Sequence, residues 1–323
     1  MAAEINEVRN TVLAIANKNN YGYISPQDFN LYAQQAQMDI FEDYFYAYNN
    51  WVNKQNARVS GTGYADVIKG LEEVIDFFSL TQTLGSVLNP NTYVLPRDYY
   101  LINKVFYYSD LLFSGTATGA GVNQLVDANA VGWTTIPASA PTPAIGSIVV
   151  NTATFEEAYV TGVVNNTTIN ISRNIFPVIG QAYEIYNSTK IREVERVHQN
   201  KIFYLTNSNL TAPTTMFPAY VMEFNGGETS RITVYPTTIT GRANIKVQYI
   251  RYPLVPRWTF TNITDGEPVF DPSQVDFQDF ELPNSDEPLL IAKICQYVGI
   301  EIREAEVYNF GKTEEGNEIQ ESN

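Results

Sequence analysis

The sequence predicts an α+β protein in which an N-terminal helical hairpin and a C-terminal helix bracket β-rich modules, one of them an inserted small β domain. Three observations support this prediction. Apolar residues recur at helical spacing near both ends of the chain. The middle is rich in β-branched and aromatic residues and is punctuated by Gly and Pro. In addition, a chain of 323 residues with 44% hydrophobic composition can bury more than one core.

The N-terminal part, residues 1–113, is expected to contain the helical hairpin and the start of the β region. Apolar residues at helical spacing predict a first helix over residues 4–19. The sequence Ser-Pro-Gln-Asp at 25–28 supplies a capping hydroxyl, a proline for the first helical position and an acid for the first turn. It predicts the start of a second helix, which runs to about residue 56. A third helix, expected over 64–79, returns beside the second.

The second half of the second helix is apolar on two adjacent faces. Beside its main apolar face, a further stripe carries Phe41, Phe45 and Tyr48. A helix of this kind is expected to be covered on two sides, by its own chain or by a neighbouring copy. The three residues are therefore candidates for a subunit interface, with burial in the core of the same chain as the alternative.

Residues 114–189 are expected to form the inserted small β domain. It opens with a stretch rich in Gly, Ala, Thr and Pro at 114–144, a composition typical of a linker. Farther on, Asn165 and Asn166 separate two strand-like segments, which predicts a hairpin because Asn tolerates the positive φ of a tight turn. A second β module spans residues 190–264. Its strands are expected around 202–205, 220–224, 232–235 and 245–250.

The C-terminal region, residues 265–310, is predicted to be an acidic segment that contains a helix. The sequence from Asn284 to Pro288 is a helix start signal, and Gly299 is expected to end the helix. The last residues, 311–323, are polar and acidic enough to predict a mobile tail.

Charge is unevenly distributed along the chain. The formal net charge is −15, and residues 265–323 hold 15 Asp and Glu against three Lys and Arg. By contrast, residues 229–264 hold five Lys and Arg and no acidic residue. We expect the acidic segment to dock on the basic module of a neighbouring copy, with ordinary solvated surface as the alternative. The residues proposed for this contact are Arg242, Lys246 and Arg251 on the basic side and Asp276, Asp279 and Glu281 on the acidic side.

Motifs for catalysis, metals and cofactors are weak in this sequence. Cys295 is the single cysteine, which excludes an intrachain disulfide and a cysteine-based zinc site, and His198 is the single histidine. The Gly-rich stretch 115–121 lacks the Lys-Ser/Thr of a phosphate loop, and the calcium-like loop at 127–138 ends in Ala instead of Glu. We therefore expect no enzyme activity and no catalytic, cofactor-binding or metal-binding residues.

Five short motifs are distributed over most of the chain outside residues 114–188. They are Asp39-Ile40-Phe41-Glu42-Asp43-Tyr44-Phe45, Pro218-Ala219-Tyr220-Val221, Val234-Tyr235-Pro236, Val247-Gln248-Tyr249-Ile250-Arg251-Tyr252-Pro253 and Asp279-Phe280-Glu281-Leu282-Pro283. These motifs resemble structural proteins of tailed phages, particularly crAss-like phages of gut bacteria. The order of helices, β middle and closing helix is similar to that of head-to-tail adaptors, which form a ring under the portal.

The resemblance implies a structural ring protein of the phage neck or tail that joins the portal to the tail and forms part of the DNA conduit. Its expected partners are copies of itself in a twelvefold ring, the portal, other neck or tail ring proteins, and genomic DNA that passes through without sequence-specific binding. The expected location is the portal vertex or tail of the virion, after assembly in the host bacterial cytoplasm. No membrane association is expected, because the sequence has neither a signal-peptide pattern nor an apolar run of roughly 20 residues.

Two other classes of function are open at this point. A tail or baseplate protein would bind a host glycan through exposed aromatics of the β modules. A virion-associated hydrolase would need a catalytic group, for which Cys295 with His198, or the carboxylates of the acidic segment, are the candidates.

Overall fold

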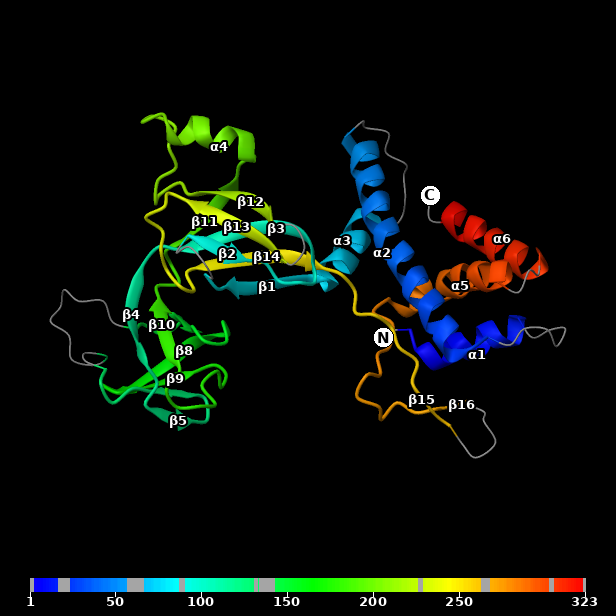
Figure 1. Cartoon of the computed structure of the whole chain (residues 1–323), viewed down its shortest axis with the longest axis horizontal. Helices are drawn as coiled ribbons and strands as arrows, with labels where there is room; N and C mark the ends of the chain where they lie inside the picture. The colour runs from blue at the N-terminus through cyan, green and yellow to red at the C-terminus, as the bar shows by residue number, and fades with distance from the viewer. Residues whose placement is uncertain are drawn as a thin grey trace. The chain divides into compact units, whose positions relative to one another are not determined.

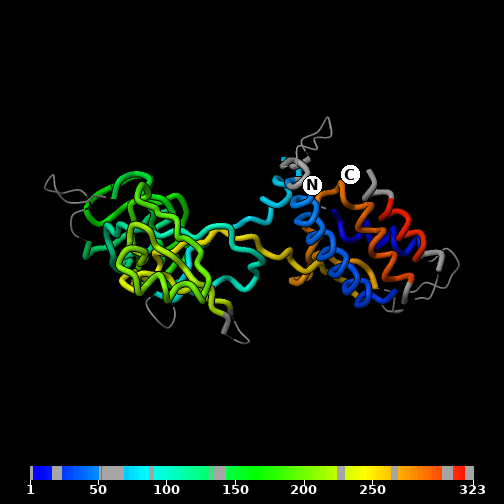
Figure 2. Tube along the Cα trace, turned by 90° about the horizontal axis from the view of Figure 1, so that it is seen from above, coloured from blue at the N-terminus to red at the C-terminus, as the bar shows by residue number. Residues whose placement is uncertain are grey.

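The structure is a computed structural model that describes residues 3–16, 24–56, 67–86, 91–130, 133, 143–225, 229–262, 268–301 and 305–321. The chain divides into two compact units. Unit 1 combines the two ends of the chain, Met1–Phe78 and Tyr252–Asn323, whereas unit 2 is the continuous middle, Ser79–Arg251. The colours of Figure 1 and Figure 2 follow this division, since the blue and the orange-to-red segments gather in one unit. The fold class is α+β, as predicted.

Unit 1 consists mainly of helices. Their bounds are α1 Ile5–Ala16, α2 Pro26–Asn56, α3 Val67–Phe77, α5 Glu287–Glu301 and α6 Ala305–Glu321, with the short 3-10 turn η1 Asn284–Asp286 directly before α5. A small hairpin of β15 Phe260–Asn262 and β16 Pro268–Phe270 belongs to the same unit. The predicted extensions of the first and third helices, residues 17–19 and 64–66, lie outside the described residues.

The core of unit 1 joins the two ends of the chain. Ile5 and Val8 on α1 are fully buried, and they belong to the same cluster as Leu290 and Ile294 on α5. Full burial of one such side chain contributes about 1.5–3 kcal/mol. The backbone N–H of Ile5 also donates to Oδ1 of Asp279 at 3.0 Å. The helical spacing of apolar residues at the N terminus is thus explained by the contact of α1 with α5.

The N-terminal helical hairpin is confirmed. At the start of α2, the backbone N–H of Asp28 donates to Oγ of Ser25 at 3.1 Å, as the capping sequence predicts. α3 returns beside α2. Directly after α3, the ring of Phe78 meets the ring of Phe41 edge-on, with the centroids 5.1 Å apart.

The helix after the acidic segment starts where predicted but does not end at Gly299. α5 begins at Glu287 and continues past Gly299, which lies inside the helix and is buried. A Cβ atom on Gly299 would lie 2.6 Å from the backbone nitrogen of Tyr308 on α6. This glycine therefore serves close helix packing and not helix termination.

A helix replaces the expected mobile tail. Residues 305–321 form α6, so the mobile tail predicted for 311–323 is wrong for its described part. A Cβ atom on Gly311 would lie 2.5 Å from the carbonyl oxygen of Ala292 on α5. The polar composition of this segment did not indicate that Gly311 lets α6 pack closely on α5.

Unit 2 contains two sheets. The strands of the main sheet are β1 Ser79–Leu84, β2 Thr92–Val94, β3 Tyr99–Tyr108, β11 Ile191–Arg196, β12 Ala219–Asn225, β13 Thr229–Tyr235 and β14 Ile245–Arg251. They lie in the order β1-β14-β3-β11-β12-β13-β2. β11 and β12 pair in parallel, whereas the other neighbours are antiparallel. Alternate residues such as Val105, Ile232 and Val247 fill the core of this sheet.

The second sheet is inserted between two neighbouring strands of the main sheet. β3 and β11 pair with each other, with Tyr108 opposite Ile191, so residues 109–190 take the place of a hairpin loop. The strands of this inserted sheet are β4 Leu111–Thr116, β5 Gly119–Gly121, β6 Gln124–Val126, β7 Ile148–Asn151, β8 Glu157–Asn165, β9 Thr168–Ile171 and β10 Ala182–Tyr186. Their order is β4-β10-β7-β8-β9-β6-β5, with antiparallel pairing throughout.

Residues 114–126 are part of the inserted sheet and not a linker. They contribute the end of β4 and the whole of β5 and β6. At Gly115, a Cβ atom would lie 2.6 Å from Oδ2 of Asp127 and 2.7 Å from the hydroxyl of Tyr183. The linker prediction is wrong for these residues because glycine is needed there for close packing within a strand.

Most strands of the second β module are confirmed. The segments 220–224, 232–235 and 245–250 lie in β12, β13 and β14. The hairpin predicted around Asn165 and Asn166 is confirmed by β8 and β9, in which Asn165 pairs with Thr168.

The strand predicted at 202–205 is instead the helix α4 Gln199–Thr206. Ile202 is buried, whereas the two residues that follow it, Phe203 and Tyr204, are both exposed. The prediction relied on composition alone. β propensity reflects how well a side chain packs on a sheet, and Ile202 is the buried residue of this segment.

Candidate interaction surfaces

Phe41 is a core residue of unit 1. Its side chain is fully buried. Its ring lies against those of Phe45, Phe78 and Tyr252, with centroid distances of 5.1, 5.1 and 6.2 Å. The prediction that Phe41 lies in a subunit interface is therefore wrong, because its own chain covers this part of the second apolar stripe.

Phe45 and Tyr48 lie nearer the surface of the same hairpin. Both side chains are partly buried. The hydroxyl of Tyr48 donates to Oε1 of Glu72 on α3 at 3.2 Å. Tyr48 therefore supports the contact between α2 and α3, and Phe45 packs against Phe41 within α2. A subunit contact of Phe45 and Tyr48 stays a prediction.

Lys246 forms an ion pair inside unit 2. Its ammonium group contacts Oε1 of Glu157, and only 13% of the Lys246 side chain and 18% of the Glu157 side chain are exposed. Oε2 of the same carboxylate accepts hydrogen bonds from Thr83 Oγ1 at 3.1 Å and from the Tyr108 hydroxyl at 3.3 Å. Burial, followed by the charge of Glu157, raises the pKa of Tyr108 above its ordinary value. Because Glu157 is on β8 and Lys246 is on β14, this contact ties the inserted sheet to the main sheet.

The other two basic candidates differ in exposure. Arg242 is exposed in the loop before β14, whereas Arg251, the last residue of β14, is partly buried. Of the three residues proposed to receive an acidic segment, Arg242 therefore has the most accessible side chain. Reversing the charge of all three would also break the ion pair of Lys246, so the assembly of such a variant would not report on a subunit contact alone.

The acidic candidates are held within their own chain. Asp276 pairs with Arg257, with Oδ2 and Nε 3.0 Å apart. Asp279 accepts the backbone N–H of Ile5, and Oε2 of Glu281 accepts the backbone N–H of Leu254 at 2.6 Å. Asp279 and Glu281 thus each hold a backbone N–H of unit 1, whereas Asp276 forms an exposed ion pair. Docking of these three carboxylates on a neighbouring copy stays a prediction.

The charge of the chain is concentrated in unit 1. This unit carries 25 Asp and Glu against 9 Lys and Arg, a formal net charge of −16. Unit 2 carries 10 against 11, a formal net charge of +1. The contrast predicted between adjacent sequence segments is therefore a contrast between two folded units. A contact between unit 1 of one copy and unit 1 of another would therefore be repulsive, whereas a contact between unit 1 and unit 2 would not.

Lys293 links three helices of unit 1. Its side chain is 10% exposed, and Nζ lies 3.0 Å from Oε1 of Glu315 on α6 and 3.2 Å from Oδ2 of Asp43 on α2. Gln296 donates to Oε2 of Glu315 at 2.7 Å. Burial alone would raise the pKa of Glu315, but the hydrogen bonds from Gln296 and Lys293 and the Lys293 charge lower it below its ordinary 4.5. Likewise, burial alone would lower the pKa of Lys293, but Glu315 and Asp43 raise it above its ordinary 10.5.

Lys293→Met is expected to destabilise unit 1 by about 1–2 kcal/mol at pH 7, because Glu315 loses its cation in a partly buried site. A carboxylate with a lowered pKa stabilises the fold above its unfolded pKa, and this contribution disappears as pH falls through its folded pKa. The difference between wild type and variant should therefore shrink below about pH 4. Thermal unfolding, followed by circular dichroism, measures the stability difference between wild type and variant at pH 7 and at pH 3.5. Glu315→Gln is the matched control. An equal difference at the two pH values would contradict this assignment.

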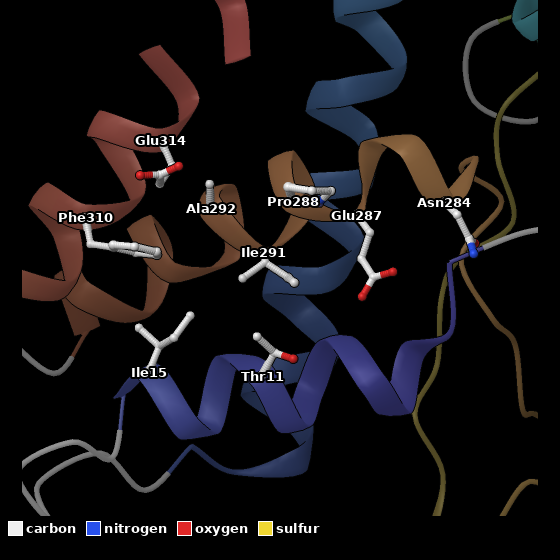
Figure 3. Close-up of a pocket in the computed structure, with 9 residues that line it drawn as sticks. All are labelled: Thr11, Ile15, Asn284, Glu287, Pro288, Ile291, Ala292, Phe310 and Glu314. Carbon is white, nitrogen blue, oxygen red and sulfur yellow. The ribbon is translucent and has the colours of Figure 1, made fainter. Parts of the chain in front are cut away.

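A groove lies between α1, α5 and α6 and has a volume of about 350 Å³. Its apolar centre comes from Ile15, Ile291 and Phe310, which point into the same space in Figure 3. Glu287 and Glu314 lie on either side of this centre. We call this feature the acidic groove, and the residues that define it are Thr11, Ile15, Glu287, Ile291, Phe310 and Glu314.

Several highly exposed apolar residues of unit 2 lie close together in the sequence on residues 198–217, which we call the α4 protrusion. Phe203 is 68% exposed and Tyr204 is 81% exposed, both on α4. In the loop that returns to β12, Leu210 is 97% exposed and Phe217 is 79% exposed. Figure 1 shows α4 on the side of the main sheet opposite the inserted sheet. Four highly exposed apolar side chains on one short segment make it a candidate interaction site.

The candidate catalytic residues differ in their surroundings and burial. Cys295 is fully buried in unit 1, and burial raises the pKa of its thiol to about 12. His198 is in unit 2, where it is exposed and precedes the first residue of α4. Asp127, the first residue of the calcium-like loop, is buried and accepts a hydrogen bond from the Tyr183 hydroxyl at 2.8 Å. Cys295 is thus a core residue, and Asp127 is hydrogen-bonded within the inserted sheet.

The residues missed by sequence reasoning are those of the α4 protrusion and Glu157. A signal for the protrusion was present, because residues 197–222 contain no acidic residue in a chain of net charge −15. The prediction of a strand at 202–205 did not use this signal. Glu157 gave no signal, because nothing in its local sequence indicates a contact with β14.

Among the described residues, no group of three or more His, Cys, Asp or Glu is placed to hold a metal ion. Within the same part of the chain, no helix has the length and apolar character required to cross a membrane. A comparison with protein-family models finds no matching family, and no curated protein matches the sequence.

Proposed function

We propose that this chain is a structural ring protein of a phage neck or tail, which joins the portal to the tail and forms part of the DNA conduit. The observation that carries this proposal is the division of charge between a unit of net charge −16 and a unit of net charge +1. Together with the resemblance of its five motifs to phage structural proteins, this division favours assembly of identical copies over turnover of a substrate.

The division of charge favours head-to-tail contacts. Because unit 1 is strongly acidic, contacts between two copies of unit 1 are electrostatically unfavourable. A contact between unit 1 of one copy and unit 2 of the next avoids this repulsion. Such a heterologous contact leaves one surface free at each end, so that it continues until the assembly closes as a ring. The twelvefold symmetry that we propose comes from the family resemblance.

The net charge is also compatible with the passage of DNA. Tight binding to nucleic acid requires Lys and Arg that neutralise phosphates, and the chain has an excess of 15 acidic residues. A ring of such subunits would let genomic DNA slide through without holding it. The protein would act in the virion, at the portal vertex or tail, with the portal and further ring proteins as its partners.

The purified full-length protein is expected to form rings, alone or on its portal. Light scattering with and without the portal gives the mass of the assembly, and electron microscopy of any large species gives its symmetry. A protein that stays monomeric and has no affinity for the portal would contradict the proposal. It would favour the tail or baseplate alternative, which a glycan array probed with the same protein then tests.

The glycan-binding alternative has weaker support in the inserted sheet, whereas the exposed Phe203, Tyr204 and Phe217 of the second β module are compatible with it. Among the described residues of the inserted sheet, the exposed large apolar side chains are mainly aliphatic, such as Val122, Val178 and Ile179. Tyr159 is the exposed aromatic residue there, at 46%. A stacking platform for sugars would be expected to present several aromatic rings.

A further inference from the structure

We propose that the α4 protrusion of one copy occupies the acidic groove of the next copy, an inference that rests on the proposed ring function. Phe203 and Tyr204 would enter the apolar centre of the groove, and Lys201 would face its acidic rim. This proposal specifies the residues on both sides of the subunit contact. The division of charge alone specifies only which units meet.

The protrusion has the chemistry of an interface anchor. Two consecutive aromatic residues on α4, Phe203 and Tyr204, are exposed, whereas Ile202 directly before them is buried. The Tyr204 ring is 81% exposed, and burial of an exposed aromatic side chain is a main source of binding free energy at interfaces.

The groove has matching dimensions and polarity. Its volume of about 350 Å³ lies within the range of small binding pockets, which is roughly 300–1,000 Å³. Its centre is apolar, and Phe310 in that centre is itself 42% exposed. The groove is thus suited to receive an aromatic side chain, and Phe310 provides a ring for that side chain to pack on.

Charge favours the α4 protrusion as the occupant of the groove. Glu287 and Glu314 border the apolar centre, and Glu314 is exposed. The protrusion carries Lys201, which is exposed, and residues 197–222 include no acidic residue. An aromatic segment with one cation and no anion is the kind of segment that an apolar groove with acidic borders attracts.

A second copy of the chain is the occupant because each copy carries both surfaces. The protrusion belongs to unit 2 and the groove to unit 1, so a contact between two copies is heterologous and leaves one protrusion and one groove free. Repetition of this contact adds further copies. It also places a unit of charge +1 against a unit of charge −16, the pairing that the charge distribution favours.

Two variants separate the two halves of the contact. Phe203→Ser with Tyr204→Ser removes the anchor, and Thr11→Trp fills the groove from an exposed position on α1. Each variant alone is expected to lose self-association by at least tenfold, in solution and on the portal. Mixed in equal amounts, the two are expected to form a heterodimer and nothing larger, because only one intact protrusion and one intact groove are present.

Charge exchange and a matched control complete the experiment. Lys201→Glu should weaken assembly, and Glu314→Lys in the same chain should restore it. Val122→Ser, which changes an apolar residue that is 84% exposed on the inserted sheet, should assemble as the wild type does. Mass photometry measures the assemblies, and circular dichroism confirms that every variant is folded.

The outcomes distinguish the contact from the function. Normal rings from either half variant would overturn the contact while leaving the ring function intact. Loss of assembly in both half variants without a heterodimer in the mixture would also overturn it, because the two surfaces would then bind something else. A heterodimer in the mixture, together with open chains instead of rings for the wild type and no affinity for the portal, would support the contact and contradict the neck or tail function.

Discussion

Glu157→Ala is expected to destabilise unit 2 by about 3 kcal/mol, because it leaves the largely buried ammonium group of Lys246 without its counter-ion. The same change removes the acceptor of Thr83 and Tyr108. For a unit of this size, such a loss lowers the midpoint of thermal unfolding by roughly 6–12 °C. Differential scanning calorimetry of the full-length protein measures this change.

Replacing both partners provides the control. Glu157→Leu with Lys246→Met removes both charges and keeps the volume, so this double variant is expected to be much closer to wild type than Glu157→Ala. If Glu157→Ala unfolds at the wild-type temperature, the ion pair does not hold the two sheets together. The comparison also matters for assembly experiments, since any charge reversal at Lys246 tests folding before it tests a contact between copies.

Phe41→Ala is expected to destabilise unit 1 by about 3–5 kcal/mol, the range for deletion of a fully buried phenyl ring. The lost ring packs against Phe45 and Phe78 within the N-terminal hairpin and against Tyr252, where the chain re-enters unit 1. The cavity left behind adds to the loss of apolar burial. Urea unfolding followed by circular dichroism measures the free energy of unfolding.

Phe203→Ala is the matched comparison, because it deletes the same ring from an exposed position. We expect it to leave the free energy of unfolding within about 0.5 kcal/mol of wild type and to reduce self-association. The opposite pattern, with a stable Phe41→Ala variant that fails to assemble, would return Phe41 to the subunit interface.

Local sequence signals predicted the helices well where one face of a helix meets a core. The capping sequence at 25–28 and the start signal before Glu287 identify the first turns of α2 and α5, because the groups that cap a helix are its immediate neighbours. The paired Asn residues identify the turn between β8 and β9 for the same reason. These features depend on contacts over a few residues, which a sequence contains directly.

Predictions failed where one residue type serves two purposes. Gly299 was expected to end a helix, and Gly311 was expected to lie in a mobile tail. Both glycines instead permit the close packing of α5 on α6. Residues 114–126 have the composition of a linker, but Gly115 permits Asp127 and Tyr183 to approach a strand. Glycine relieves backbone strain and also makes room for a neighbour, and only the position of the neighbour distinguishes the two uses.

The candidate site depended still more on tertiary structure. The sequence predicted that an acidic segment would meet a basic module, because the composition of the two segments shows their opposite charges. Which charges meet was decided by folding, since Lys246 pairs with Glu157 and Asp276 with Arg257 inside the chain. Which aromatic residues are exposed was decided likewise, with Phe41 buried and Phe203 exposed. The sequence by itself determined the α+β class, the capped helix starts and the excess of acid near the C terminus, because these follow from local periodicity and composition. The tertiary structure decided which surfaces are left for partners, because burial depends on contacts between residues that lie far apart in the chain.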